Sequence, residues 1–326
     1  MLTIPQLKKD FTDSLKSLSR SRHPAETFSS FLEITAICLH QVPYEHGDFP
    51  KSDEDYQRLE AKYFEAIKGY TADELTTMAH MMSMTLLAHR TEFCDFLGEL
   101  AGENELLNQD GGQFFTPYSL CSLMAQTSLM DASKIVEEQG LITISDPAVG
   151  GGAMLIASAE ELLRQKIDPR SCAQFDAVDV SRNAFNMAYI QLSALDLQAM
   201  VRHGDTLSTQ MWENRPTPQL RYFERDLRQR QAINKMMQIM TNPEAFMAGE
   251  AASERTQAPH EATLPIEEHG DVDEPDTPIQ QSLLTSQEFS SVDSTSEGPA
   301  KTSRRKADVE FPVDRQLGLF SNENDG

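Results

Sequence analysis

The feature that most constrains the fold is a run of three glycines between a short apolar segment and an amphipathic one. Residues 141–144 are apolar and rich in β-branched side chains, which favours a short buried strand. An Asp-Pro pair at 146–147 ends that strand, and the glycines at 150–152 allow a tight turn without a Cβ in the way. Apolar residues at helical spacing then predict a helix over 153–165. Such a turn leaves backbone N–H groups at the helix N-terminus free to bind an anionic group.

A second strand and a third are predicted to follow in the same pattern. The second, 175–178, ends on Asp179, and a carboxylate in that position can accept two hydrogen bonds from a ribose diol. After a helix over 181–195, a third strand near 199–202 leads to Asp205. These strands make half of a doubly wound sheet, and no fourth strand is evident. A glycine run alone is equally compatible with an ordinary loop that binds no ligand. The interpretation as a ligand-binding turn therefore depends on the order of the strands, the glycine turn and the acids along the chain.

Four strings in this order resemble the S-adenosylmethionine-binding half of N6-adenine DNA methyltransferases, specifically the modification subunits of type I restriction systems. They are Gly-Gln-Phe-Phe-Thr-Pro at 112–117, Asp-Pro-Ala-Val-Gly-Gly-Gly at 146–152, Ala-Val-Asp-Val at 177–180 and His-Gly-Asp-Thr-Leu at 203–207. The resemblance covers roughly residues 95–210 and implies a partial, Rossmann-like methyltransferase sheet with S-adenosyl-L-methionine as cofactor. It implies that the acid and glycines of the turn hold the methionine part, that Asp179 holds the ribose, and that Asp205 holds the adenine amino group. The cofactor-binding residues implied in this way are Phe115, Thr116, Pro117, Asp146, Pro147, Ala148, Gly150, Gly152, Asp179 and Asp205.

Three regions are expected along the chain: a helical domain at 1–100, a methyltransferase-like domain at 101–240 and an acidic tail at 241–326. The first region shows four helical patterns, the last opened by a capping box at 71–74. Segment 95–99 resembles the family's link between its helical bundle and its catalytic domain. The tail is dominated by Ser, Thr, Glu, Asp, Pro and Gln, a composition that predicts disorder.

Two further helices are predicted within the methyltransferase-like domain. One spans 118–130 and feeds the first strand, and the other spans 220–240 with an apolar stripe. The first strand would be an unpaired apolar edge of the sheet, which proteins rarely leave exposed. We therefore expect the 220–240 helix, the N-terminal helices or another protomer of an oligomer to cover it.

The net charge and the cysteine content limit which partners and which cellular compartment are expected. The net charge is −23, of which the tail supplies −12 through 18 acidic and 6 basic residues. The remainder is also acidic, so tight DNA binding by the chain alone is not expected, and contact with DNA is expected to be indirect or made with a partner subunit. The four cysteines are scattered without a Cys-x-x-Cys pair, which argues against zinc and against a disulfide framework and therefore for a reducing cytoplasm. No apolar run approaches the ~20 residues of a membrane span.

The family's Asn/Asp-Pro-Pro-Tyr/Phe motif, which holds and stacks the flipped adenine, is absent, since no two prolines are adjacent in the sequence. The nearest string, Asn-Pro-Glu-Ala-Phe at 242–246, lacks the second proline. Three hypotheses therefore stand. The chain is an adenine N6-methyltransferase that uses an unusual base pocket or a partner chain, a catalytically inactive cofactor-binding accessory protein, or a degenerate structural remnant.

A short string near the C-terminus resembles the pentapeptide by which bacterial replication and repair proteins bind the sliding clamp. An acidic tether would let a short motif reach a partner, and the apolar side chains would fill a pocket that an isolated tail cannot provide. Alternatively the string is a chance apolar patch, or a strand that packs back on the domain. The partner-binding residues expected here are Gln316, Leu317, Leu319 and Phe320.

Overall fold

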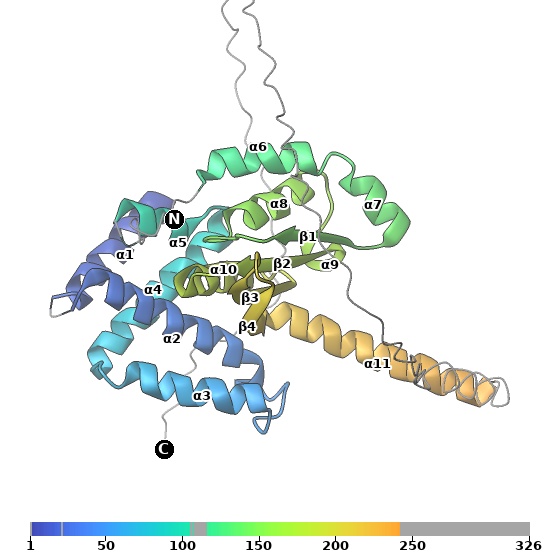
Figure 1. Cartoon of the computed structure of the whole chain (residues 1–326), viewed down its shortest axis with the longest axis horizontal. Coiled ribbons are helices and arrows are strands. Elements are labelled where there is room, and N and C mark those ends of the chain that lie inside the picture. The colour runs from blue at the N-terminus through green and yellow to red at the C-terminus, as the bar shows by residue number, and fades with distance from the viewer. Residues whose placement is uncertain (1, 21, 105, 107–115, 242–326) are drawn as a thin grey trace, which may run out of the picture. The chain divides into compact units, whose positions relative to one another are not determined.

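The computed structural model describes residues 2–20, 22–104, 106 and 116–241. Within this part of the chain helices pack against a single four-stranded sheet of order β1-β2-β3-β4, in which the first three strands run parallel and the fourth antiparallel (Figure 1). The strands are β1 Ile142–Asp146, β2 Ala173–Asp179, β3 Ala199–Asp205 and β4 Gln210–Pro216. The α/β class and the three predicted strands are confirmed.

One face of the sheet is covered by helices. Ile142, Phe175 and Val201 belong to the main hydrophobic core, together with residues of helices α8 (Ala153–Arg164) and α10 (Arg182–Ala194). On the alternate positions Thr143 is exposed and Gln174 and Arg202 are half-buried. This period of two is typical of a sheet with one buried face, whereas purely parallel sheets normally bury both.

The expectation that no fourth strand would be found is wrong. β4 pairs with β3 through a register that shifts between His203 and Gly204. It carries Glu213 and Arg215 on the face that packs against the helices, so its sequence lacks the apolar alternation by which a strand is recognised. Ion pairing between these two side chains, at 2.6 Å, replaces apolar burial.

The helix predicted at 118–130 is present, and a second helix that was not predicted lies between it and β1. Helix α6 (Tyr118–Ser128) packs against α8, and α7 (Ala132–Gln139) packs against β1. α7 ends at Gly140, whose φ of 76° lies in the left-handed region that favours glycine. A short helix, α9 (Pro169–Cys172), leads into β2.

Five helices precede α6 in the described residues: α1 Ile4–Leu18, α2 Pro24–Glu45, α3 Glu54–Ile67, α4 Ala72–Thr91 and α5 Phe96–Glu103. The predicted capping box at Thr71 and Glu74 is present and opens α4. α5, which begins within the 95–99 string and has Asp95 as its N-cap, was not predicted as a helix. The main core cluster runs from Leu7 to Val201, so it includes residues on both sides of the predicted boundary at 100.

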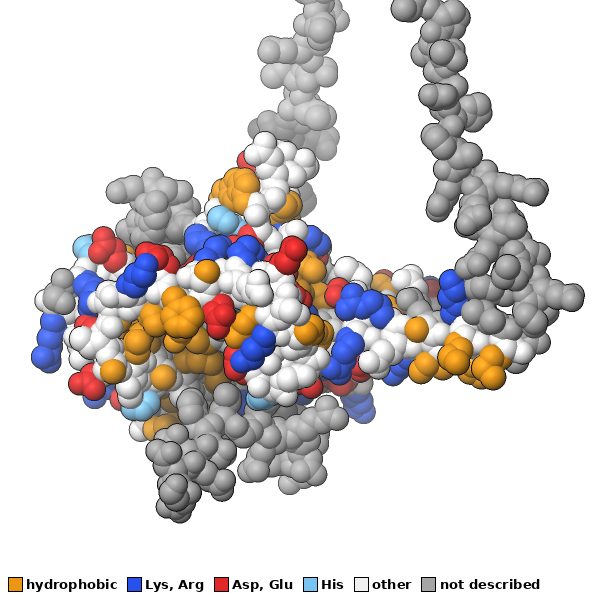
Figure 2. All heavy atoms as spheres, turned by 90° about the horizontal axis from the view of Figure 1, so that it is seen from below, with side chains coloured by type: hydrophobic (Ala, Val, Ile, Leu, Met, Phe, Trp, Pro, Cys, Tyr) orange, Lys and Arg blue, Asp and Glu red, His pale blue; other side chains and the backbone are white. Residues whose placement is uncertain are grey.

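The last described helix, α11 (Pro218–Thr241), packs against the rest of the described fold through its start. It contacts α2, β3 and β4, and Leu220 and Arg221 are buried there. From Asp226 onward its described side chains are exposed. Figure 2 shows hydrophobic side chains gathered near the far end of this helix, where Ile233, Met236, Met237 and Met240 lie.

Of the three segments expected to cover the edge of β1, the 220–240 helix lies elsewhere. α11 packs at the opposite end of the sheet, and in the described residues no strand pairs with the outer side of β1. Thr143 and Ser145 on this strand are exposed, which makes the edge more polar than expected. No helix in the described part of the chain is both long and apolar enough to cross a membrane.

Candidate functional site

The glycine turn connects β1 to α8 and is fixed by its own backbone. Gly150 and Gly152 have φ of 56° and 103°, so both need the left-handed freedom that glycine provides. The N–H of Gly152 donates to the carbonyl of Val149 at 2.9 Å, and the N–H of Val149 donates to the carbonyl of Val178 at 2.9 Å. The turn is therefore tied to the end of β2 before any ligand binds.

The N-terminus of α8 opens directly from this turn. Gly152 is its N-cap, and among the described residues no side chain caps the helix. A Cβ on Gly152 would come within 3.6 Å of the Cα of Ala188, so the turn also lies close to α10. Uncapped N–H groups at a helix start attract an anionic group such as a carboxylate.

Three predicted carboxylates end three neighbouring strands. Asp146, Asp179 and Asp205 are the last residues of β1, β2 and β3, which are adjacent and parallel. Parallel strands present their carboxyl ends at one edge of the sheet, about 4.8 Å apart per strand. The structure thus arranges these three carboxylates in one row beside the glycine turn, as the sequence predicts.

Each carboxylate in the row is held by backbone N–H groups. Asp146 accepts from Ala148 at 3.0 Å, and burial raises the pKa of its carboxyl, to which the nearby charge of Asp179 adds. Asp205 accepts from Leu207 at 2.9 Å, and hydrogen bonds from the Ser208 hydroxyl and this N–H lower the pKa of its carboxyl.

A further bond ties the end of β3 to the turn. The hydroxyl of Thr206 donates to the carbonyl of Pro147 at 2.7 Å. Pro147 and Ala148 themselves are exposed, while Gly150 and Asp179 are half-buried. The edge therefore presents accessible backbone and side-chain acceptors that the fold has already oriented.

The Phe-Thr-Pro string lies only partly within the described residues. Phe115 falls outside them, whereas Thr116 and Pro117 are exposed just before α6, with Pro117 as its N-cap. Cys121 of α6 packs with Ala153 of α8, next to the glycine turn. The start of α6 therefore brings Thr116 and Pro117 to the α8 side of the turn. The predicted partner-binding residues Gln316, Leu317, Leu319 and Phe320 lie outside the described residues.

Two apolar residues at the row were not identified from the sequence. Val180 directly follows Asp179 and is 62% exposed, and Leu207 lies two residues after Asp205 and is 97% exposed. An exposed apolar side chain beside a strand-ending carboxylate can contact the face of a flat ring. In the sequence, these two residues could have been identified from their positions one and two residues after Asp179 and Asp205. Next to them His203 lies edge-on to Trp212 of β4, with ring centroids 4.9 Å apart.

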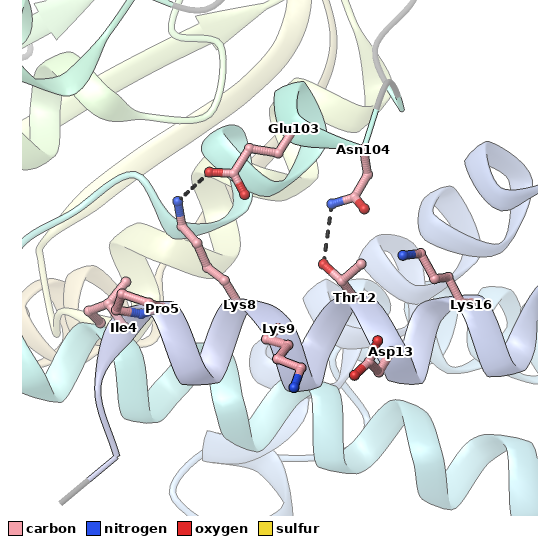
Figure 3. Close-up of a pocket in the computed structure, with 9 residues that line it drawn as sticks. All are labelled: Ile4, Pro5, Lys8, Lys9, Thr12, Asp13, Lys16, Glu103 and Asn104. Carbon is pink, nitrogen blue, oxygen red and sulfur yellow. Dashed lines mark hydrogen bonds and ion pairs between the residues drawn. The ribbon is translucent and has the colours of Figure 1, made fainter.

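A pocket of about 510 Å³ lies elsewhere, along α1 and the end of α5 (Figure 3). Lys8 pairs there with Glu103 at 2.8 Å, and the amide of Asn104 donates to Thr12 at 3.3 Å. Because Lys8 and Glu103 pair with each other and the pocket shares no residue with the row of carboxylates, we assign this pocket no ligand. The residues that line the pocket are Ile4, Pro5, Lys8, Lys9, Thr12, Asp13, Lys16, Glu103 and Asn104.

The described residues hold no group of His, Cys, Asp and Glu side chains suited to a metal ion.

Comparison with known proteins yields one match. The model of the family described as N-6 DNA Methylase matches residues 95–267, or 173 of the 326 residues. The match includes the glycine turn, the row of carboxylates and helix α5. No curated protein and no solved structure matches the chain.

Proposed function

The chain belongs to the N-6 DNA methylase family, and we propose that it binds S-adenosyl-L-methionine at the carboxyl edge of its sheet, as part of DNA adenine modification. The observation that carries this proposal is the row of Asp146, Asp179 and Asp205 beside an uncapped helix N-terminus. The row matches a ligand with an amino acid at one end, a ribose in the middle and an adenine at the other end. The strands fit one half of a Rossmann-like methyltransferase sheet.

The proposed contacts follow from charge and hydrogen-bonding capacity. The N–H groups at the start of α8 bind the methionine carboxylate, and the negative charge of Asp146 stabilises the positively charged ammonium and sulfonium groups. Asp179 accepts hydrogen bonds from the ribose hydroxyls. Asp205 accepts from the adenine amino group, and Val180 and Leu207 flank the ring.

Methyl transfer needs a second element that this sequence lacks. Without the Asn/Asp-Pro-Pro-Tyr/Phe motif a flipped adenine has neither a polar acceptor nor a stacking ring from this chain. We infer that a partner chain supplies the base pocket within a restriction–modification type of system. The outer edge of β1, with which no strand of the described residues pairs, is a position where a partner strand could extend the sheet.

Two measurements on the purified chain test this proposal. Calorimetry with S-adenosylmethionine should show binding. Transfer of label from tritiated S-adenosylmethionine to DNA should be weak or absent until the partner is added. Lack of cofactor binding would refute the proposal, and strong N6-methyladenine formation by the chain alone would contradict the assignment of the base pocket to a partner.

The second candidate is a catalytically inactive, cofactor-binding accessory protein that the sliding clamp recruits to DNA. The string at 316–320 favours it, because an acidic protein that binds DNA poorly could be delivered by the clamp. Binding of cofactor without methyl transfer under any partner condition would support this candidate.

A further inference from the structure

The buried side chain of Gln191 of α10 forms hydrogen bonds with α4, with the start of α5 and with the glycine turn. We call Gln191 together with Asp95 the hub. The amide Nε2 of Gln191 donates to the carbonyl of Gly151 at 2.6 Å and to Oδ1 of Asp95 at 2.7 Å. Its Oε1 accepts from the N–H of Leu97 at 3.0 Å and lies 3.1 Å from Nε2 of His89. Because the side chain is fully buried, water cannot replace these bonds, and each one lost leaves an unsatisfied polar group.

Asp95 forms the second part of this hub. Its side chain is buried at the start of α5, where Oδ1 also accepts from the N–H of Gly98 at 3.0 Å. A Cβ on Gly151 would lie 2.7 Å from Oδ1 of Asp95, so the carboxylate fits only against a glycine. Asp95 thus packs directly on the central glycine of the turn.

The hub therefore links the N-terminal helices to the glycine turn. α4 contributes His89, α5 contributes Asp95 and Leu97, and α10 contributes Gln191. The carbonyl of Gly151 is the only atom of the turn to which Gln191 bonds among the interactions of the described residues. Rotation of this peptide would change the direction of the neighbouring N–H groups at the start of α8.

We propose that Gln191 and Asp95 are positioning residues that set the glycine turn for the amino-acid end of the cofactor, so that the N-terminal helices are part of the binding site. The inference rests on the proposed function, since it assumes that this edge binds S-adenosylmethionine. It assigns the hub to the methionine part alone. The adenosine end is served by Asp205, which is fixed separately by Leu207 and Ser208.

The test compares two ligands that differ only in the amino-acid end. S-Adenosylhomocysteine carries it, and 5′-methylthioadenosine lacks it, while both carry ribose and adenine. Calorimetry on the full chain should show that Gln191→Met binds S-adenosylhomocysteine about tenfold more weakly, as expected when buried hydrogen bonds are lost. Its affinity for 5′-methylthioadenosine should stay within about twofold of wild type.

The ratio of the two affinities is insensitive to partial unfolding, because a smaller folded fraction lowers the apparent affinity for both ligands by the same factor. Gln198→Met is the matched control. Gln198 is also buried and donates to a backbone carbonyl, that of Arg170. It directly precedes β3, so it lies at the amino ends of the strands, away from the row of carboxylates. It should leave both affinities unchanged. If Gln191→Met does not fold, Gln191→Leu, which also removes the amide and adds no charge beside Asp95, replaces it with the same expected result.

The outcomes separate this inference from the proposed function. A wild-type chain that binds neither ligand refutes both. A wild-type chain that binds both ligands, with Gln191→Met unchanged or equally weakened for the two, refutes the positioning role and leaves the proposed function intact.

Discussion

Asp179 and Gly150 are joined directly, with Oδ2 of the carboxylate accepting from the N–H of the glycine at 2.9 Å. The other oxygen, Oδ1, accepts from the N–H of Ser181 at 2.8 Å. A single side chain at the end of β2 therefore fixes both the turn after β1 and the start of α10. It keeps lone pairs on both oxygens for a ligand, since each carboxylate oxygen can accept two hydrogen bonds.

Replacing Asp179 with alanine should weaken cofactor binding strongly. The change removes acceptors for the ribose hydroxyls, each contributing about 1.5–3 kcal/mol when charge-assisted, and it also frees Gly150. Calorimetry should show at least a tenfold loss of affinity for S-adenosylmethionine. Asp176→Ala is the control, because this acid on the same strand pairs with Arg202 at 2.8 Å, on the more open face of the sheet. Equal affinities in wild type and Asp179→Ala would remove Asp179 from the site.

Replacing Gly151 with alanine should destabilise the protein, because the new methyl group would overlap the buried carboxylate of Asp95. Overpacking of this kind costs about 1–3 kcal/mol. Thermal or urea unfolding measures the change. Gly102→Ala in α5 is the matched control, since no atom lies within 4 Å of its Cβ position and alanine favours a helix. Comparable stabilities for the two variants would show that the turn can move away from Asp95.

The buried His40 should make the protein lose stability as the pH falls. Burial, aided by the charges of Arg221 and Arg215, lowers the pKa of its imidazole to about 2. Below about pH 6.5 the unfolded chain takes up a proton that the folded chain does not, so stability declines with falling pH until the folded pKa is reached. Between pH 7 and pH 5 this one group removes about 2 kcal/mol.

Urea unfolding at pH 7 and at pH 5 checks this dependence. His40→Leu should show a smaller difference between the two pH values than wild type, whatever its stability at pH 7. His80→Leu, at an exposed position on α4, is the control for replacing a histidine as such. The same difference in wild type and His40→Leu would show that His40 takes up a proton in the folded state.

A peptide of residues 311–326 should bind bacterial sliding clamp, with Leu319 and Phe320 filling an apolar pocket. Fluorescence polarisation with a labelled peptide measures the affinity. The double substitution Leu319→Ala and Phe320→Ala should abolish binding. A wild-type peptide that does not bind, or a double variant that binds equally well, would make the resemblance a coincidence of composition.

Local sequence patterns located the central elements because each pattern acts over a few residues. β-Branched runs, a capping box and consecutive glycines restrict their own backbone, and the structure has the predicted strands, the helix after the turn and the capped α4. β4 was missed because its inward side chains are Glu213 and Arg215, which pair with each other and with distant residues. The helix predicted at 118–130 corresponds to α6, whereas α7 was not predicted.

The sequence by itself determined the family, the glycine turn and the acids at the strand ends, since these depend on residue type and order along the chain. Only the tertiary structure decided which distant residues support that turn. Gln191 and Asp95 are separated by 96 positions, and nothing in either local pattern indicates that both contact Gly151. Their roles arise when α5 and α10 pack side by side and leave polar groups that only one another can satisfy, because burial excludes water from all of them.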